Sequence, residues 1–111
     1  MKHSTKILAL LAAFAAAGAL GHAATASDNW SNNCAKCHGA DGKGETKIGR
    51  KLRVKDYTDA KVQAAVTDAQ MENAITNGVQ EHGRHVMKAF KSDLSPAEIK
   101  DLVAFMRKFK A

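Results

Sequence analysis

Two cysteines and one histidine have a spacing that predicts a definite chemistry. Cys34 and Cys37 are the only cysteines in the 111-residue chain, and His38 follows at once, which gives the pattern C-x-x-C-H. Residues three apart share one face of a helix. Two thiols placed in this way can add to the two vinyl groups of a haem as thioethers, and the next residue then lies beneath the iron as a ligand. The pattern therefore predicts one covalently attached haem c, with His38 as an iron ligand.

Two other uses of a C-x-x-C pair agree less well with the rest of the sequence. A zinc site needs four ligands, and the remaining candidates, His82 and His85, form only a loose H-x-x-H pattern. A redox-active dithiol of the thioredoxin type is expected within a βαβ unit, and no strand pattern is present. A disulfide between the two cysteines would close a very small loop and stabilise little. A haem also supplies the apolar core that so short a chain needs.

The second axial ligand is expected from a residue far from the cysteines in sequence. Met87 lies beyond Gly83 in a predicted loop that could cross the opposite face of the haem. Phe90 would seal the pocket beyond it. Met71 and Met106 lie in predicted helices, where methionine is more often part of the core. The loop also holds two rival ligands, His82 and His85. We expect Met87 to bind the iron, with histidine ligation or an open sixth position as the alternatives.

The elements that position these residues are expected to be helices. Apolar spacing and cap residues predict helices over residues 28–36, 59–65, 68–77 and 96–109. Thr67 and Ser95 each open a capping box, and Gly78 is expected to end the third helix in a left-handed conformation. Residues 38–56 and 79–94 are predicted loops, and no segment alternates like a strand. We expect an all-α domain of four helices whose two long loops wrap the haem.

The first 26 residues have the composition of a secretory signal peptide. Lysines come first, an apolar stretch rich in Ala and Leu follows, and Ala24-Thr25-Ala26 gives an A-x-A cleavage pattern. The clean apolar run, residues 7–20, is shorter than the roughly 20 residues of a membrane span. We expect cleavage after Ala26, export to the periplasm, and a mature domain of residues 27–111 that is not inserted in the membrane.

The charge of the chain limits the classes of partner. Of 17 basic and 11 acidic residues, two lysines and no acidic residue lie in the predicted signal, so the mature part has a net charge of +4. Two ionised haem propionates would lower this to about +2. The cations are spread along the chain and aromatic residues are few, which argues against a nucleic-acid binder. We expect a monomer with a mildly positive face that docks acidic redox proteins.

The sequence resembles the class I cytochrome c family over residues 27–111. Residues 34–44 resemble the family's haem-binding stretch, and residues 49–52 resemble its G-P-x-L segment. Residues 87–90 resemble its M-P-x-F ligand loop, and residues 94–107 resemble its terminal helix. Arg50 and Lys88 stand where the family usually has proline. In the family, the carbonyl of the first of these prolines accepts the Nδ1 proton of the haem-binding histidine. Arg50 can supply the same carbonyl to His38.

The resemblance implies a one-electron carrier of a respiratory chain. A thioether ligand favours ferrous iron, so ligation by His38 and Met87 would raise the reduction potential. Six-coordinate iron leaves no place for a substrate, so we expect no enzyme activity. The alternative is a ligand-binding or peroxidase-like haem protein whose sixth position is open or taken by histidine.

Several other residues are assigned to the core or to the pocket. Trp30 is expected to pack against Phe105 or Met106 of the terminal helix. Leu52 and Leu94 are expected to line the haem pocket. The side chains that could reach a haem propionate are Tyr57, Arg50, Lys51 and Arg53.

Overall fold

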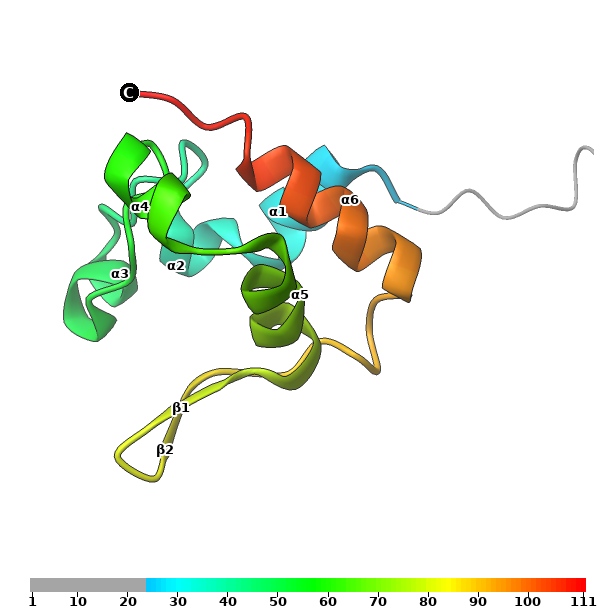
Figure 1. Cartoon of the computed structure of the whole chain (residues 1–111). Helices are drawn as coiled ribbons and strands as arrows, with labels where there is room; N and C mark the ends of the chain where they lie inside the picture. Colours follow the sequence, from blue (N-terminus) through cyan, green and yellow to red (C-terminus); the bar gives the residue numbers. More distant parts are fainter. Residues whose placement is uncertain (1–23) are drawn as a thin grey trace, which may run out of the picture.

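The structure is a computed structural model that describes residues 24–111. The predicted signal peptide, residues 1–26, lies almost wholly outside this range, so its cleavage remains a prediction. The described residues form six helices and one antiparallel hairpin (Figure 1). The elements are α1 (Ala26–Asn33), α2 (Ala35–His38), α3 (Lys47–Leu52), α4 (Ala60–Ala65), α5 (Asp68–Asn77), β1 (Val79–Glu81), β2 (Arg84–Met87) and α6 (Pro96–Met106). No helix within residues 24–111 has both the length and the hydropathy needed to cross a membrane.

The predicted first helix is present, but it is divided at the first cysteine. The hydroxyl of Thr25 accepts from the Asp28 amide and caps α1. Cys34 leaves the helical conformation, with φ −120° and ψ −38°, and its amide still donates to the Trp30 carbonyl. The His38 amide then donates to the Cys34 carbonyl, so α2 continues the chain as one more turn. Both thiols and the histidine therefore come from a single helical stretch, as the spacing predicts.

Helix α3 lies in a region that the sequence predicts as loop. Its six residues are too few for an apolar period to be visible, and the signals that form it are at its ends. Thr46 caps its start by accepting from the Gly49 amide, and Arg53 ends it in the left-handed conformation with φ +54°. The loop over residues 38–56 is thus partly helical.

Helices α4, α5 and α6 confirm three predictions, including both capping boxes. Thr67 and Ser95 accept from the amide three residues on, and Gln70 and Glu98 accept from the cap amides in return. Gly78 ends α5 with φ +76°, a conformation open to glycine. Helix α6 ends at Met106, three residues earlier than predicted.

The prediction that no strand is present is wrong. Strands β1 and β2 pair antiparallel, with Gln80 opposite His85 and Glu81 opposite Arg84. The two residues between them, His82 and Gly83, have φ values of +51° and +76°, as a two-residue type I′ turn requires. The strands have only three and four residues, too short for an alternating pattern to stand out.

The core lies where α1 and α5 pack against α6 (Figure 1). Leu102 of α6 is fully buried, and Met71 and Ile75 of α5 lie against the same helix. The Trp30 ring packs against Phe105 at a centroid distance of 5.7 Å, which confirms that prediction. The hairpin extends from the lower end of α5, away from this core.

Candidate functional site

One cavity of about 650 Å³ contains all four predicted site residues. Cys34, Cys37 and His38 line it from the helical stretch of α2, and Met87 lines it from β2. Cofactor and ligand pockets typically measure roughly 300–1,000 Å³ and are mainly apolar with a few placed polar groups. Residues separated by about fifty positions in the sequence therefore meet at one site of suitable size.

The two cysteines are free thiols on the α2 side of this cavity. Cys34 is buried and Cys37 is half-buried. Burial, and to a smaller extent the neighbouring Cys37, raises the pKa of the Cys34 thiol to about 11. Cys34 is therefore a neutral thiol at physiological pH. Both cysteines line the volume in which the vinyl groups of a haem would have to lie.

His38 presents to the same cavity a neutral imidazole that has one nitrogen without a hydrogen-bond partner. Burial lowers its pKa below the ordinary value, which favours the uncharged ring that binds metals. Its Nδ1 is the one buried side-chain nitrogen or oxygen within residues 24–111 that lacks a hydrogen-bond partner. The bond expected from Nδ1 to the Arg50 carbonyl is thus not formed; that carbonyl accepts from the Arg53 amide at 3.3 Å as α3 ends. The His38 ring lies between Trp30 and Tyr57, at centroid distances of 5.7 and 5.9 Å.

The α2 side of the cavity is fixed by side-chain bonds to backbone groups. Trp30 donates from its indole nitrogen to the Gly39 carbonyl at 2.9 Å, which ties the end of α2 to the core. Thr46 donates its hydroxyl to the Cys37 carbonyl at 2.7 Å while it caps α3. Gly49 packs so closely that an added Cβ would collide with the Cys37 carbonyl. The cysteine and histidine side chains thus project from a well-anchored support.

The opposite side of the cavity is the hairpin and the segment that follows it. Met87 is half-buried, and Phe90, which is 6% exposed, lines the cavity as predicted. The anchor points lie just beyond Met87: the Phe90 amide donates to the Ile75 carbonyl at 2.8 Å, and the Lys91 amide donates to the Thr76 carbonyl at 3.2 Å. This side therefore rests on α5 only at the base of the hairpin.

The rival ligands lie elsewhere. His82 and His85 are exposed on the hairpin and do not line the cavity, and His85 contacts the Gln80 amide. Met106 is buried in the core, as predicted. Met71, predicted as core, is buried in the core and also lines the cavity from α5.

The residues predicted around the haem separate into two groups. Leu52, Arg53 and Tyr57 line the cavity, and burial raises the pKa of the Tyr57 phenol against the opposing charge of Arg107. Leu94 is a core residue, and Arg50 and Lys51 are exposed outside the cavity. The prediction for Leu94 is wrong, because its position just before α6 packs it inward.

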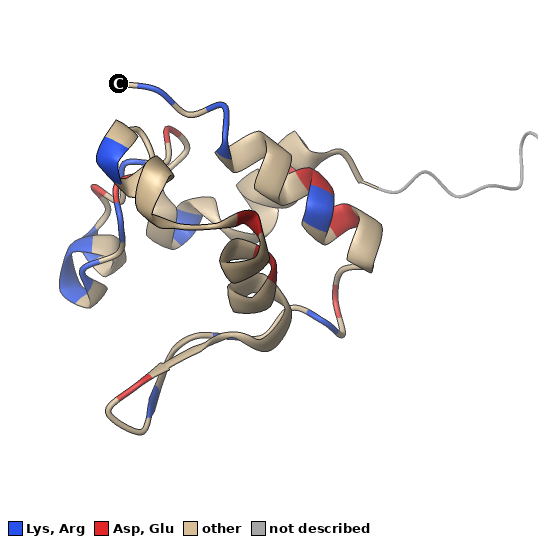
Figure 2. Cartoon of the chain, viewed as in Figure 1, with Lys and Arg blue, Asp and Glu red and all other residues tan. Residues whose placement is uncertain are grey.

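A basic surface, which consists of Lys47, Arg50, Lys51, Arg53 and Lys55, covers α3 and the segment after it. All five residues are exposed, and the two ion pairs within residues 24–111 include none of them. Figure 2 shows this concentration of Lys and Arg on α3, whereas α5 carries acidic residues and α6 carries residues of both signs. Arg53 and Lys55 also line the cavity, together with the exposed Lys36. The basic surface thus borders the cavity.

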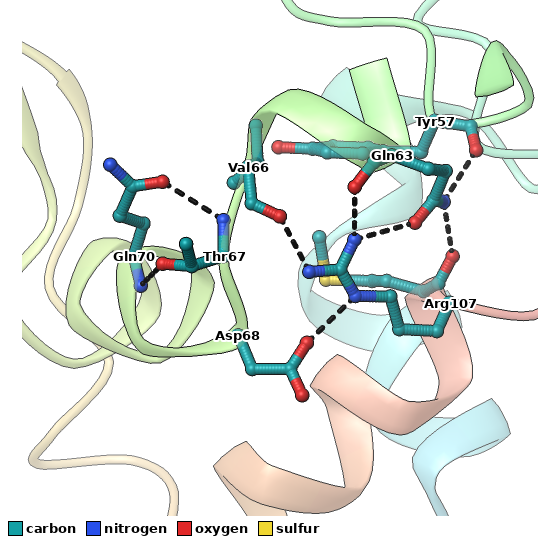
Figure 3. A network of polar contacts seen from close by, with 8 residues as sticks. Tyr57, Gln63, Val66, Thr67, Asp68, Gln70 and Arg107 are labelled. Carbon is teal, nitrogen blue, oxygen red and sulfur yellow. Dashed lines mark hydrogen bonds and ion pairs between the residues drawn. The ribbon is translucent and has the colours of Figure 1, made fainter. Parts of the chain in front are cut away.

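Arg107 forms a polar network for which no sequence pattern gives a reason (Figure 3). Its guanidinium donates to the Gln63 carbonyl, the Val66 carbonyl and the Asp68 carboxylate. These partners are about forty residues away in sequence, so no local pattern marks them. The network joins the end of α6 to the junction of α4 and α5.

A family model places this fold and site among known proteins. The model described as "Cytochrome C oxidase, cbb3-type, subunit III" matches residues 21–106. The chain belongs to the cytochrome c family. Members of this family are typically electron carriers and not enzymes, and the c-type cytochromes carry covalent haem c.

Solved structures agree with this assignment. The KustC0563 c-type cytochrome superposes with a TM-score of 0.71 at 33% identity, over 79% of this chain and 100% of that chain. A point mutant of Kustc0563, with phenylalanine in place of a tyrosine, gives a TM-score of 0.68 at 33% identity, over 78% and 100%. No curated protein matches the chain. The resemblance to the cytochrome c family is therefore confirmed, and the mostly helical domain is a cytochrome c fold.

Proposed function

We propose that this cytochrome carries one haem c, bound through Cys34, Cys37, His38 and Met87, and works as a one-electron carrier. The observation that carries the proposal is that these four side chains, and neither loop histidine, line one cavity of about 650 Å³. The residues present fit the group: two free thiols, an imidazole that burial keeps neutral, and a thioether on the opposite side. When bound, the haem supplies one-electron redox chemistry at its iron.

Each residue has a distinct part in this proposal. Cys34 and Cys37 hold the cofactor as thioethers, which prevents its loss outside the cell. His38, kept neutral by burial, donates a nitrogen lone pair to the iron. Met87 donates a soft thioether, which favours the ferrous state and raises the potential. With His38 and Met87 as the protein ligands, the same ligands would serve both oxidation states, and no coordination site would be left for a substrate.

We further propose that the carrier works in the periplasm as a monomer and that acidic redox proteins dock on the basic surface. The signal-like residues 1–26 support export. Two of the five cations of the basic surface, Arg53 and Lys55, line the cavity, so a partner held on this surface would lie close to the cofactor. Charges of opposite sign steer such encounters, and salt screens them over about 10 Å at 0.1 M.

The intact mass of the purified protein after denaturation tests the attachment and the export together. The expected mass is that of a chain beginning near Ser27 plus one haem. Addition of cyanide or CO to the native protein should leave its six-coordinate, low-spin spectrum unchanged. A haem that dissociates on denaturation would contradict covalent attachment, and rapid ligand binding would favour the ligand-binding or peroxidase-like alternative.

Electron transfer to an acidic partner protein tests the docking surface. Reversing the charge of Lys51 should slow transfer and weaken its dependence on salt. Lys100, a cation on α6 away from the basic surface, provides the matched control, because Lys100→Glu changes the net charge by the same amount. Equal rates for Lys51→Glu and for Lys100→Glu would contradict docking at α3.

A further inference from the structure

Arg107 stands at the end of α6, but its side chain binds a different part of the chain. Nη1 donates to the Gln63 carbonyl at 2.6 Å and to the Gln63 side-chain oxygen at 2.9 Å, while Nη2 donates to the Val66 carbonyl at 2.5 Å. Carbonyls at the end of a helix have no partner within that helix. The Gln63 and Val66 carbonyls lie at the end of α4, so α6 supplies the cap that α4 lacks.

Gln63 extends this network toward the cavity. Its amide nitrogen donates to the Tyr57 carbonyl at 2.7 Å and to the Met106 carbonyl at 2.9 Å (Figure 3). Tyr57 also donates from its own amide to the Gly42 carbonyl at 2.9 Å. The backbone at Tyr57 is therefore held between the loop after α2 and the end of α6.

Tyr57 and Val66, whose carbonyls accept hydrogen bonds from this network, both line the cavity. The Tyr57 ring lies 5.9 Å from the His38 ring, and Val66 is half-buried against the core. They form one part of the cavity wall, which is called here the Tyr57–Val66 wall. Arg107 itself is not among the residues that line the cavity.

We propose that Arg107 is a positioning residue for the haem pocket, which acts through Gln63 and the Val66 carbonyl to hold the Tyr57–Val66 wall over the cofactor. The proposal rests on the proposed function, since it concerns the haem held by that site. Water access and local dielectric are levers by which a protein sets a haem potential. A loosened wall admits water, which stabilises the more highly charged ferric state, so the potential falls.

Two variants that preserve net charge separate positioning from simple electrostatics. Arg107→Lys keeps the positive charge, but an ammonium group cannot reproduce the planar fork that binds several acceptors at once. Gln63→Met is close in size, is neutral, and removes both bonds to the Tyr57 and Met106 carbonyls. Asp68→Asn is the matched control, because Asp68 binds the exposed side of the same guanidinium and does not line the cavity.

The reduction potential and the amide hydrogen exchange of Tyr57 are measured on the haem-loaded proteins. Arg107→Lys and Gln63→Met should both lower the potential and speed exchange at Tyr57, while Asp68→Asn should leave both at the wild-type values. Wild-type potentials and exchange in the first two variants would overturn the proposal, whatever their thermal stability. Loss of folding in both would also overturn it, because the network would then support the whole chain and not one wall.

The same experiment distinguishes failure of this inference from failure of the proposed function. A wild-type protein without a haem spectrum defeats the proposed function. A wild-type protein with the His/Met spectrum, whose Arg107→Lys and Gln63→Met variants keep its potential, defeats only the role of Arg107.

Discussion

The two sides of the cavity are built differently. On the α2 side, the support for Cys37 and His38 is fixed by bonds from Trp30 and Thr46 to backbone carbonyls and by the tight contact at Gly49. On the opposite side, Met87 lies on a two-stranded hairpin that is anchored to α5 only at its base. A two-stranded hairpin alone is at best marginally stable in water.

This difference indicates which interactions keep each side of the cavity ordered. In the folded chain the α2 side is held by protein contacts, and it presents the cysteines and histidine without help from Met87. The hairpin side has few contacts of its own, so a bound haem and a bond from Met87 to iron would contribute much of its order. In the proposed function, attachment of the haem therefore belongs to the α2 side, and ligation of the sixth position belongs to the hairpin side.

The largest effect is expected from removing the covalent attachment. Cys34→Ala with Cys37→Ala should give a largely unfolded chain, because the haem supplies apolar core that so small a domain lacks. Circular dichroism during heating measures this. A cooperative helical transition in the haem-free double variant would show that the α2 side and the core fold alone.

The second-largest effect is expected from removing the Met87 side chain, which should change the sixth position without affecting the attachment. Met87→Ala should keep the haem, lose the weak red band of the ferric His/Met spectrum, lower the potential and admit external ligands. His82→Ala and His85→Ala should be spectrally silent. The matched control is Met106→Ala, which should leave the spectrum unchanged but cost about 2–5 kcal/mol of stability, since Met106 is buried in the core. A spectrum altered by a histidine substitution and not by Met87→Ala would mean His/His ligation.

A single added methyl group should distinguish the packing of the two sides. In Gly49→Ala the new Cβ would meet the Cys37 and Gly44 carbonyls, so α3 must move, at a cost of about 1–3 kcal/mol. Denaturant titration measures this cost, and the haem spectrum should report a disturbed α2 side. In Gly83→Ala the methyl meets no atom within 4 Å, and the cost is strain confined to the turn at φ +76°. Equal disturbance of the α2 side by both variants would contradict the comparison.

The smallest effect is expected from acid acting on the contact between α1 and α6. The side chain of Asn29, with the amide of Ser95, binds Glu98 and lowers the pKa of its carboxyl below the ordinary 4.5. A lowered pKa stabilises the fold above the ordinary value, and this contribution is lost as the pH falls through the folded-state value. Glu98→Gln should therefore lose less stability than wild type when denaturation at pH 7 is compared with denaturation near pH 3. Identical losses in the two proteins would contradict a role for this carboxylate.

Local signals were enough to predict most of the helices and to mark Cys34, Cys37 and His38, which the structure brings to one cavity. The C-x-x-C-H spacing, the capping boxes at Thr67 and Ser95, and the apolar period of α6 are all read within a few residues. Met87 could be singled out by its place in the chain and by the resemblance to the family. The attachment motif and the helix caps depend on bonds between residues that are close in the sequence, so a short stretch of sequence is enough to predict them.

What the sequence did not predict depends on contacts between distant segments. Helix α3 is fixed partly by the Thr46 hydroxyl, which donates to the Cys37 carbonyl nine residues earlier. Phe109 leaves the helical path beyond α6 and packs 5.0 Å from the Trp30 ring. Arg107 binds acceptors about forty residues away. None of these pairings leaves a local pattern.

A reversible redox titration of the wild-type protein, followed by its visible spectrum, tests the central claim most directly. The account predicts a single one-electron transition at high potential between two low-spin, six-coordinate states, with the His/Met band present in the ferric form. A high-spin or five-coordinate spectrum in either state, or a low-potential transition without that band, would contradict a carrier whose iron is bound by His38 and Met87.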